Sequence, residues 1–345
     1  MILNGVVSAM LSRLYLPRFN MHPVFVPLHG NLDHELSTSS AAILGTKLTV
    51  RNNKQAGETS FVNYKDTAKS YDMARNVLGC DIILGAMAMG ETGVPLNEQS
   101  LLDAGCGTGN YITKLISRVG RVTAQDFSKG MLEKCSAKFA SNPKVMSIDQ
   151  GDITDLEKYS DNTFDAYISN QVIQHIETDK SRPSLNNLRK SMEEAYRVLK
   201  PGGVCVISTR SKEPFYEDLY WYTALAPEAV AKMTKRVPSR EAIKSAYEAA
   251  GFKVTMAVTP KYKSIMNERH YYNPEGVFDE AWRRGESWWS LVSPAELASL
   301  QTIVREKIDA GTVDDWIKER DVLRTKAGQV LFMAAIKPVH LPSFQ

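Results

Sequence analysis

The sequence predicts an α/β fold with a mostly parallel sheet, and three observations support this prediction. Short apolar runs alternate with segments of helical periodicity along the middle of the chain. The run at residues 101–104 leads into a glycine-rich turn and a helical pattern, as in the strand–turn–helix units of open sheets. Two further runs, at residues 252–258 and 328–336, complete a count of seven strands.

The other elements follow from periodicity and from the residues that start and stop helices. We expect the remaining strands at residues 121–126, 144–148, 163–170 and 204–208. We expect helices at residues 77–89, 111–119, 128–140, 184–200 and 239–251. Ser239 is a helix-capping residue and Gly251 a terminating one, and Pro201 with the two glycines after it stops the helix before them.

The glycine-rich turn is the first candidate binding element. Gly105, Gly107 and Gly109 let the backbone adopt positive φ and let a ligand approach closely. The helix after the turn offers free N–H groups at its start. In an open α/β sheet, such a turn at the carboxyl end of a strand is where ligands bind.

The spacing of the turn separates several ligand classes. The dinucleotide fingerprint fails because Asn110 stands at its last position, and the phosphate-loop pattern fails because no lysine follows Gly109. The remaining pattern, Asp103-x-Gly-x-Gly-x-Gly, resembles the first motif of the class I S-adenosylmethionine (SAM) dependent methyltransferases. The resemblance extends over residues 60–338. It implies a Rossmann-like, seven-stranded, mostly parallel sheet with an antiparallel edge strand, and it implies SAM as the cofactor.

Further cofactor residues lie at the ends of the next strands. Asp126 ends a strand 17 positions beyond Gly109, where a carboxylate accepts hydrogen bonds from ribose hydroxyls. The resemblance adds Phe127, beside this acid, to the cofactor site. It also places Asp152 at the adenine amino group and Ile153 beside the ring, although Asp152 is equally typical of a turn that caps a helix.

The predicted fourth strand ends at Asn170, and Gln171 follows it. The resemblance implies that the sheet edge faces the methyl donor at this point. The family members that methylate exocyclic amines of nucleic acids carry Asn/Asp-Pro-Pro-aromatic at this point. Val172 and Ile173 follow here instead, which favours a small-molecule acceptor over nucleic acid. His175 is the candidate general base because imidazole titrates near neutral pH, and the alternative is a hydrogen-bonded wall residue.

Tyr64 and Tyr71 lie one heptad apart on one face of a predicted helix. This segment resembles the tyrosine-bearing helix that closes over the cofactor in many small-molecule methyltransferases. The alternative is that both tyrosines pack against the core.

Two insertions, at residues 211–238 and 261–327, predict a helical cap over the acceptor. They contain all five tryptophans, and Ser293 and Glu296 form a predicted capping box within the second. We expect an acceptor pocket lined by five aromatic residues, Tyr220, Trp221, Tyr271, Tyr272 and Trp288. Arg283 or Arg284 is expected to pair with an acceptor carboxylate. The alternative is that the aromatic residues form the cap's own core.

Composition limits the remaining possibilities. The net charge of +3 gives no argument for a polyanionic partner, and the four cysteines are too scattered to suggest a metal site. No apolar run reaches the roughly 20 residues of a membrane span. Residues 1–60 read as an extension and linker ahead of a domain at 61–338, with a tail at 339–345. We expect an intracellular protein, cytoplasmic or, if the acid-free residues 1–32 act as a transit peptide, mitochondrial or plastid. The sequence does not specify an oligomeric state.

These features together predict a SAM-dependent methyltransferase that acts on a small-molecule acceptor, with the O, N, S or C acceptor atom open. Such an enzyme must align acceptor, methyl group and sulfur, and must exclude water. Two alternatives remain, a nicotinamide-dependent oxidoreductase on a similar sheet and a SAM-binding module without turnover.

Overall fold

The computed structural model describes residue 72 and residues 75–177, 185–210, 219–261 and 263–339. Tyr64 and Tyr71, the predicted cofactor-closing residues, lie outside these ranges.

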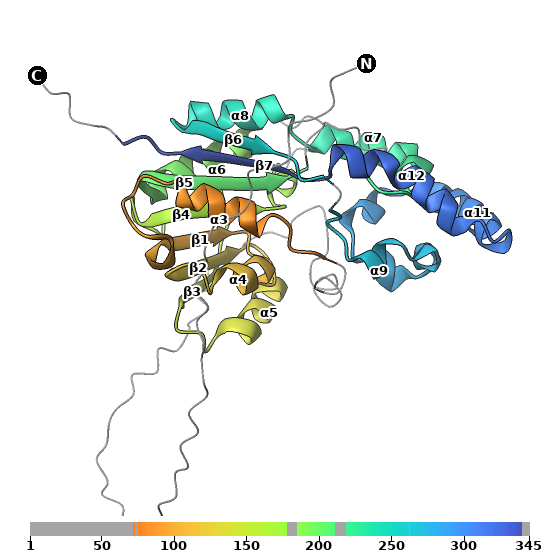
Figure 1. The fold of residues 1–345 in the computed structure, drawn as a ribbon, viewed down its shortest axis with the longest axis horizontal. Coiled ribbons are helices and arrows are strands. Elements are labelled where there is room, and N and C mark those ends of the chain that lie inside the picture. The colour runs from red at the N-terminus through yellow and green to blue at the C-terminus, as the bar shows by residue number, and fades with distance from the viewer. Residues whose placement is uncertain (1–71, 73–74, 178–184, 211–218, 262, 340–345) are drawn as a thin grey trace, which may run out of the picture. The chain divides into compact units, whose positions relative to one another are not determined.

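Seven strands form one sheet in the order β3-β2-β1-β4-β5-β7-β6 (Figure 1). Their bounds are β1 Ser100–Ala104, β2 Arg121–Asp126, β3 Val145–Gln150, β4 Phe164–Asn170, β5 Leu199–Thr209, β6 Lys253–Val258 and β7 Leu331–Ile336. Strands β1 to β5 are parallel, whereas β7 pairs antiparallel with both β5 and β6. The predicted seven-stranded, mostly parallel sheet is confirmed, and its antiparallel strand lies one position inside the β6 edge.

Helices cover both faces of the sheet. Leu101 packs in the cluster that holds α3 Cys80–Ala88, α4 Asn110–Leu115 and α5 Lys129–Phe139. The next residue, Leu102, packs in the opposite cluster with α6 Asn186–Val198 and α8 Arg240–Ala249. Side chains alternate across a strand, so β1 contributes to both halves of the core. All five of its residues are buried, as expected of a strand covered on both faces.

Several element boundaries differ from the predicted ones. α3 begins at Cys80 because Gly79 ahead of it adopts φ +69°, which does not continue a helix. α4 ends at Leu115, four residues early, although Val119 remains buried. β5 begins at Leu199 because Gly202 and Gly203 exchange backbone hydrogen bonds with Lys337, which follows β7.

The two insertions contain helices and short 3-10 turns beside the sheet (Figure 1). The described elements are η4 Thr223–Leu225, α7 Pro227–Arg236, α9 Glu268–Tyr271, η5 Pro274–Phe278, α10 Glu280–Arg283, η6 Ser287–Leu291, α11 Pro294–Asp309 and α12 Val313–Ala327. The predicted capping box at Ser293 and Glu296 is present at the start of α11. We refer to residues 219–238 and 263–327 as the cap. Among the helices of the described residues, none combines the length and apolarity needed to cross a membrane.

Candidate cofactor and acceptor site

The glycine turn after β1 is shaped by φ values that only glycine adopts readily. Gly105, Gly107 and Gly109 have φ of +83°, +55° and +80°. A Cβ atom at Gly105 would lie 2.3 Å from Val172, and one at Gly109 would lie 2.6 Å from Phe139. A Cβ atom at Gly107 would meet no atom of the described part of the chain within 4 Å. Packing therefore requires the outer two glycines, whereas the middle one borders open space that a ligand can approach.

Asp126 at the end of β2 holds this turn in place. One carboxylate oxygen accepts the N–H of Gly107 at 2.8 Å, and the other accepts the N–H of Ser128 at 2.8 Å. Burial raises the pKa of Asp126, and the two N–H donors act against the shift because they favour the ionised form. The predicted ribose-binding acid thus lies beside the glycine turn.

Asp103 in β1 is a fully buried carboxyl group. Burial raises its pKa to about 8, and the nearby charge of Asp126 adds to the shift. Its Oδ2 atom has no hydrogen-bond partner among the described residues. A buried carboxyl oxygen without a partner is costly, and a ligand donor would remove that cost.

Other polar atoms without partners lie near the carboxyl ends of neighbouring strands. In the part of the chain that the structure describes, they include Oε1 of Gln125, Nδ2 of Asn170 and Nε2 of Gln171. Gln171 also adopts φ +58°, a conformation that non-glycine residues rarely take. With Asp103, these residues offer both donors and acceptors to a polar ligand. This arrangement, with the open space at Gly107, fits a nucleoside cofactor that carries hydroxyl and amino groups.

The two predicted adenine residues have different environments. Ile153 is buried, whereas Asp152 is exposed. The Asp152 carboxylate accepts the N–H of Thr154 at 2.8 Å and its hydroxyl at 2.9 Å. This contact is the turn cap that was the alternative interpretation, and the adenine role stays a prediction. Phe127 is half-buried next to Asp126.

His175 ends a 3-10 turn, η2 Ile173–His175, directly after β4. Burial lowers its pKa to about 4, and the positive charge of Arg210 contributes to the shift. The imidazole is therefore neutral at pH 7 and able to accept a proton, but it is a weak base.

The predicted acceptor aromatics come together in the cap, where four of the five are fully buried. The backbone N–H of Trp221 donates to the hydroxyl of Tyr271 at 3.1 Å, and its indole N–H donates to the carbonyl of the same residue at 2.8 Å. Tyr220 stacks on Tyr222 with ring centroids 5.2 Å apart, and Trp288 lies 5.4 Å from the same ring. These are the contacts of a packed core. Their role in acceptor binding stays a prediction.

Tyr272 and the two predicted arginines lie closer to solvent. Tyr272 is 40% exposed, and its hydroxyl donates to Asp321 at 2.8 Å. Arg283 donates to the carbonyl of Val277 at 2.8 Å, and Arg284 is exposed and forms an ion pair within its own helix turn. Pairing of either arginine with an acceptor carboxylate stays a prediction.

Sequence reasoning missed a buried charge cluster between the sheet and the cap. Glu286, at the start of η6, forms ion pairs with Arg75 at 2.7 Å and with Arg210 at 3.1 Å. It also accepts the hydroxyl of Tyr220 at 2.9 Å. Burial opposes ionisation of Glu286, but the two guanidinium groups hold its pKa at about 2. The available sequence signal was a lone acid within a tryptophan-rich run.

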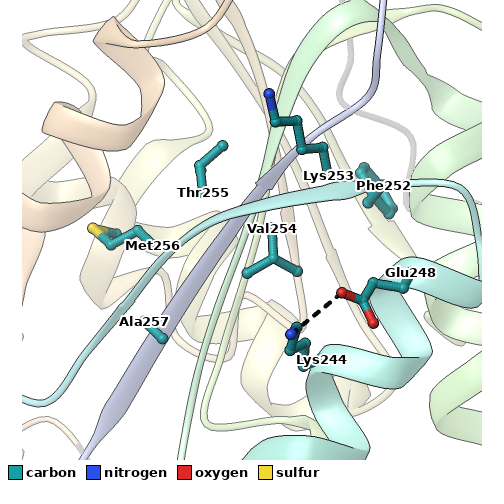
Figure 2. A pocket seen from close by; sticks show the side chains of 8 residues that line it. All are labelled: Lys244, Glu248, Phe252, Lys253, Val254, Thr255, Met256 and Ala257. Carbon is teal, nitrogen blue, oxygen red and sulfur yellow. Dashed lines mark ion pairs between the residues drawn. The ribbon is translucent and has the colours of Figure 1, made fainter.

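A groove of about 580 Å³ lies elsewhere, between α8 and the edge strand β6 (Figure 2). It is lined by Lys244, Glu248 and residues 252–257, and the two charged side chains of α8 form an ion pair at 3.6 Å. Three strands separate β6 from β1, and none of the predicted site residues lines this groove.

Comparisons with known proteins agree with this arrangement. Residues 102–207 match the methyltransferase domain family. The chain is 28% identical over 218 residues to a demethylmenaquinone methyltransferase from Clavibacter sepedonicus, which covers 58% of this chain and 84% of that protein. It is 33% identical over 157 residues to a malonyl-[acyl-carrier protein] O-methyltransferase from Serratia marcescens, which covers 46% of this chain but only 53% of the relative.

A solved structure, of a putative methyltransferase from an antibiotic biosynthesis pathway of Anabaena variabilis, is similar in fold. Its TM-score is 0.57 at 19% identity, over 74% of this chain and 96% of that chain. The glycine turn after β1, the strand order and the matches in sequence make the chain similar to class I SAM-dependent methyltransferases.

Proposed function

We propose that this chain binds SAM at the carboxyl ends of β1, β2 and β4 and transfers its methyl group to a small-molecule acceptor. One observation carries the proposal. Among the described residues, buried donors and acceptors without partners lie near the carboxyl ends of the strands, and no described atom occupies the space next to Gly107. Bound SAM would supply an electrophilic methyl group at this point.

The residues of the sheet edge have separate roles in this proposal. Asp126 accepts ribose hydroxyls while it holds the N–H of Gly107. Asp103 provides a buried negative charge for a ligand cation. Asp152, Ile153 and Phe127 contact the adenine end. Asn170 and Gln171 hold the part of the cofactor nearest the methyl group with their free amide donors.

The acceptor binds between this edge and the cap, where water is excluded. His175 is neutral, so it orients an acceptor by a hydrogen bond or takes its proton during transfer. Because a pKa of about 4 makes it a weak base, an acceptor that is already acidic or that carries no proton suits the site best. The relatives include proteins named for a demethylated quinone and for a malonyl thioester, so an activated carbon or a carboxylate oxygen is the first choice.

The test is calorimetric titration of the whole chain with SAM, S-adenosylhomocysteine (SAH) and NAD, followed by acceptor screening with labelled methyl groups. We expect saturable binding of both adenosyl compounds and none of NAD, and then label transfer to an acceptor of the classes above. Failure of the adenosyl compounds to bind would overturn the proposed site. Binding without label transfer to any acceptor would favour a SAM-binding module without turnover.

A further inference from the structure

A short segment ahead of α3 contacts the cap through its first two residues. We call residues 75–78 the strap. The amide of Asn76 donates to the carbonyls of Ser264 at 3.1 Å and Met266 at 2.8 Å, and its backbone N–H donates to Ile265 at 2.8 Å. Arg75 forms an antiparallel bridge with Met266. The strap is thus fastened to the second insertion by backbone and side chain together.

Asp72, ahead of the strap, contacts the glycine turn, and Leu78, within the strap, contacts the helix that follows the turn. The hydroxyl of Thr108, between Gly107 and Gly109, donates to Asp72, three residues before the strap. Asp72 also pairs with Lys138 of α5 at 2.6 Å. The hydroxyl of Tyr111, in the helix that follows the turn, donates to the carbonyl of Leu78 at 3.0 Å. Tyr111 thus connects the carboxyl end of the strap to the helix that begins directly after the turn, so a shift of that helix displaces the strap.

The ion pair between Arg75 and Glu286 is an electrostatic contact between the strap and the cap. Glu286 is completely buried, and the side chain of Arg75 is 12% exposed. Arg210, which directly follows β5, and Tyr220 hold the same carboxylate. One carboxylate therefore joins the strap, the sheet and both insertions. Removing one partner of a buried pair leaves a charge uncompensated, so this contact tolerates little displacement.

A second buried cluster in the cap provides a contrast. Asp321 of α12 pairs with Arg324 and accepts the hydroxyls of Tyr271 and Tyr272. It has the same chemistry as the Glu286 cluster, a carboxylate with a guanidinium and tyrosine donors. Within the part of the chain that the structure describes, its partners lie in the second insertion, so it links the cap only to itself.

We propose that Arg75 and Glu286 form a positioning pair that transmits the state of the glycine turn to the acceptor cap. A ligand that orders the turn restrains the start of α4, hence Tyr111 and the strap that it contacts, and hence the Glu286 end of the cap. The identity of that ligand rests on the proposed function, whereas the coupling between the glycine turn, the strap and the cap does not.

The experiment is hydrogen–deuterium exchange of the whole chain with and without saturating SAH, alongside SAH titration. The main variant is Arg75→Gln, which removes the strap's charge but leaves Glu286 paired with Arg210. Arg75→Lys is the conservative rescue, and Asp321→Asn is the matched control for loss of charge in a buried carboxylate cluster. Glu286→Gln is a second disruption from the other side of the pair.

In the wild type we expect SAH to slow exchange in residues 286–291. Arg75→Gln should keep SAH affinity within about threefold yet lose that slowing, and its exchange there should rise by about tenfold or more without ligand. Arg75→Lys should restore part of the slowing, and Asp321→Asn should retain it. A merely structural role predicts instead that Arg75→Gln and Asp321→Asn behave alike, and that result would overturn the proposal.

If the wild type bound no SAH, the proposed function would fail, but the link would still be decided by the ligand-free proteins. Arg75→Gln should then speed exchange both in residues 286–291 and in the glycine turn, whereas Asp321→Asn should leave the turn unchanged. Faster exchange in the cap alone would refute the coupling.

Discussion

The carboxyl edge of the sheet and the cap each contain a buried carboxyl group, but the pKa of this group is raised at the sheet edge and lowered in the cap. Asp103 at the sheet edge has an oxygen without a partner, and its pKa is raised to about 8. Glu286 in the cap has two guanidinium partners and a tyrosine, and its pKa is held at about 2. Burial raises the pKa of both carboxyl groups, so the hydrogen-bond and ion-pair partners decide whether the pKa ends above or below its usual value. A completed cluster indicates a structural joint, and an incomplete one indicates a place for a ligand.

The largest effect is expected for Trp288→Ala, which tests whether the cap has a structural role that is separate from the sheet edge. Trp288 is fully buried among aromatic rings, and removing such a side chain costs about 3–5 kcal/mol of unfolding free energy. SAH affinity should stay unchanged, because the residues proposed to bind the cofactor lie at the strand ends and not in the cap. Denaturant unfolding and calorimetry measure the two quantities. A variant with wild-type stability would show that Trp288 does not belong to a packed core, and would strengthen its acceptor role.

The next test fills the open space at the glycine turn. Gly107→Val should weaken SAH binding by more than about 100-fold, since the new side chain occupies space that no protein atom uses. Its positive φ should cost a further 1–3 kcal/mol of stability, roughly. Gly93→Val is the matched control, because Gly93 also has a positive φ, +74°, and open space around its Cβ position. Equal affinities in the two variants would refute the placement of the cofactor.

The strands and the glycine turn were predictable because their signals are local. Apolar runs, caps and glycines fix β2 to the residue and β1, β4 and β6 to within one residue. The early end of α4 and the early start of β5 were missed. The second depends on Lys337, more than a hundred residues away in sequence, which pairs with Gly202 and Gly203.

The Glu286 cluster shows why the cap was harder to predict. Arg75, Arg210 and Glu286 come from three distant segments, and no local pattern relates them. The sequence directed attention to Arg283 or Arg284, close to Glu286 in the chain, as the partner of an acceptor carboxylate. The fold instead engages Arg283 with the carbonyl of Val277. Charges that meet only after folding leave no periodic or spaced signature in the chain.

A smaller effect is expected at Asp126. Asp126→Ala should weaken SAH binding by about tenfold, because it removes both a ligand acceptor and the anchor of the Gly107 N–H. The global fold should persist, since strand β2 is held by pairing on both sides. Calorimetry and thermal unfolding measure both effects. Asp152→Ala should weaken binding less, because that exposed carboxylate mainly caps its own turn. A larger loss of affinity in Asp152→Ala than in Asp126→Ala would mean that Asp152 contributes more to binding than Asp126.

The last prediction concerns the pH dependence of binding and the protonation of Asp103. With its pKa at about 8, Asp103 is mostly protonated in the ligand-free protein near pH 7. A cationic ligand favours the ionised form, so binding of SAM should release a proton, and affinity should rise with pH by up to about tenfold per unit. The measurement belongs between about pH 5.5 and pH 7, below the range in which the ligand's own α-amino group titrates.

Two controls separate Asp103 from other titrating groups. Asp103→Asn should remove the pH dependence, because the amide stays neutral throughout. The uncharged ligand 5′-methylthioadenosine should bind the wild type with little pH dependence, since it carries neither the ammonium nor the sulfonium group. Proton release is read directly by calorimetry in two buffers of different ionisation enthalpy. If the affinity for SAM does not change with pH, Asp103 does not interact with the positive charge of the ligand. The oxygen without a partner would then be a buried polar group that lowers stability, and it would not belong to a binding site.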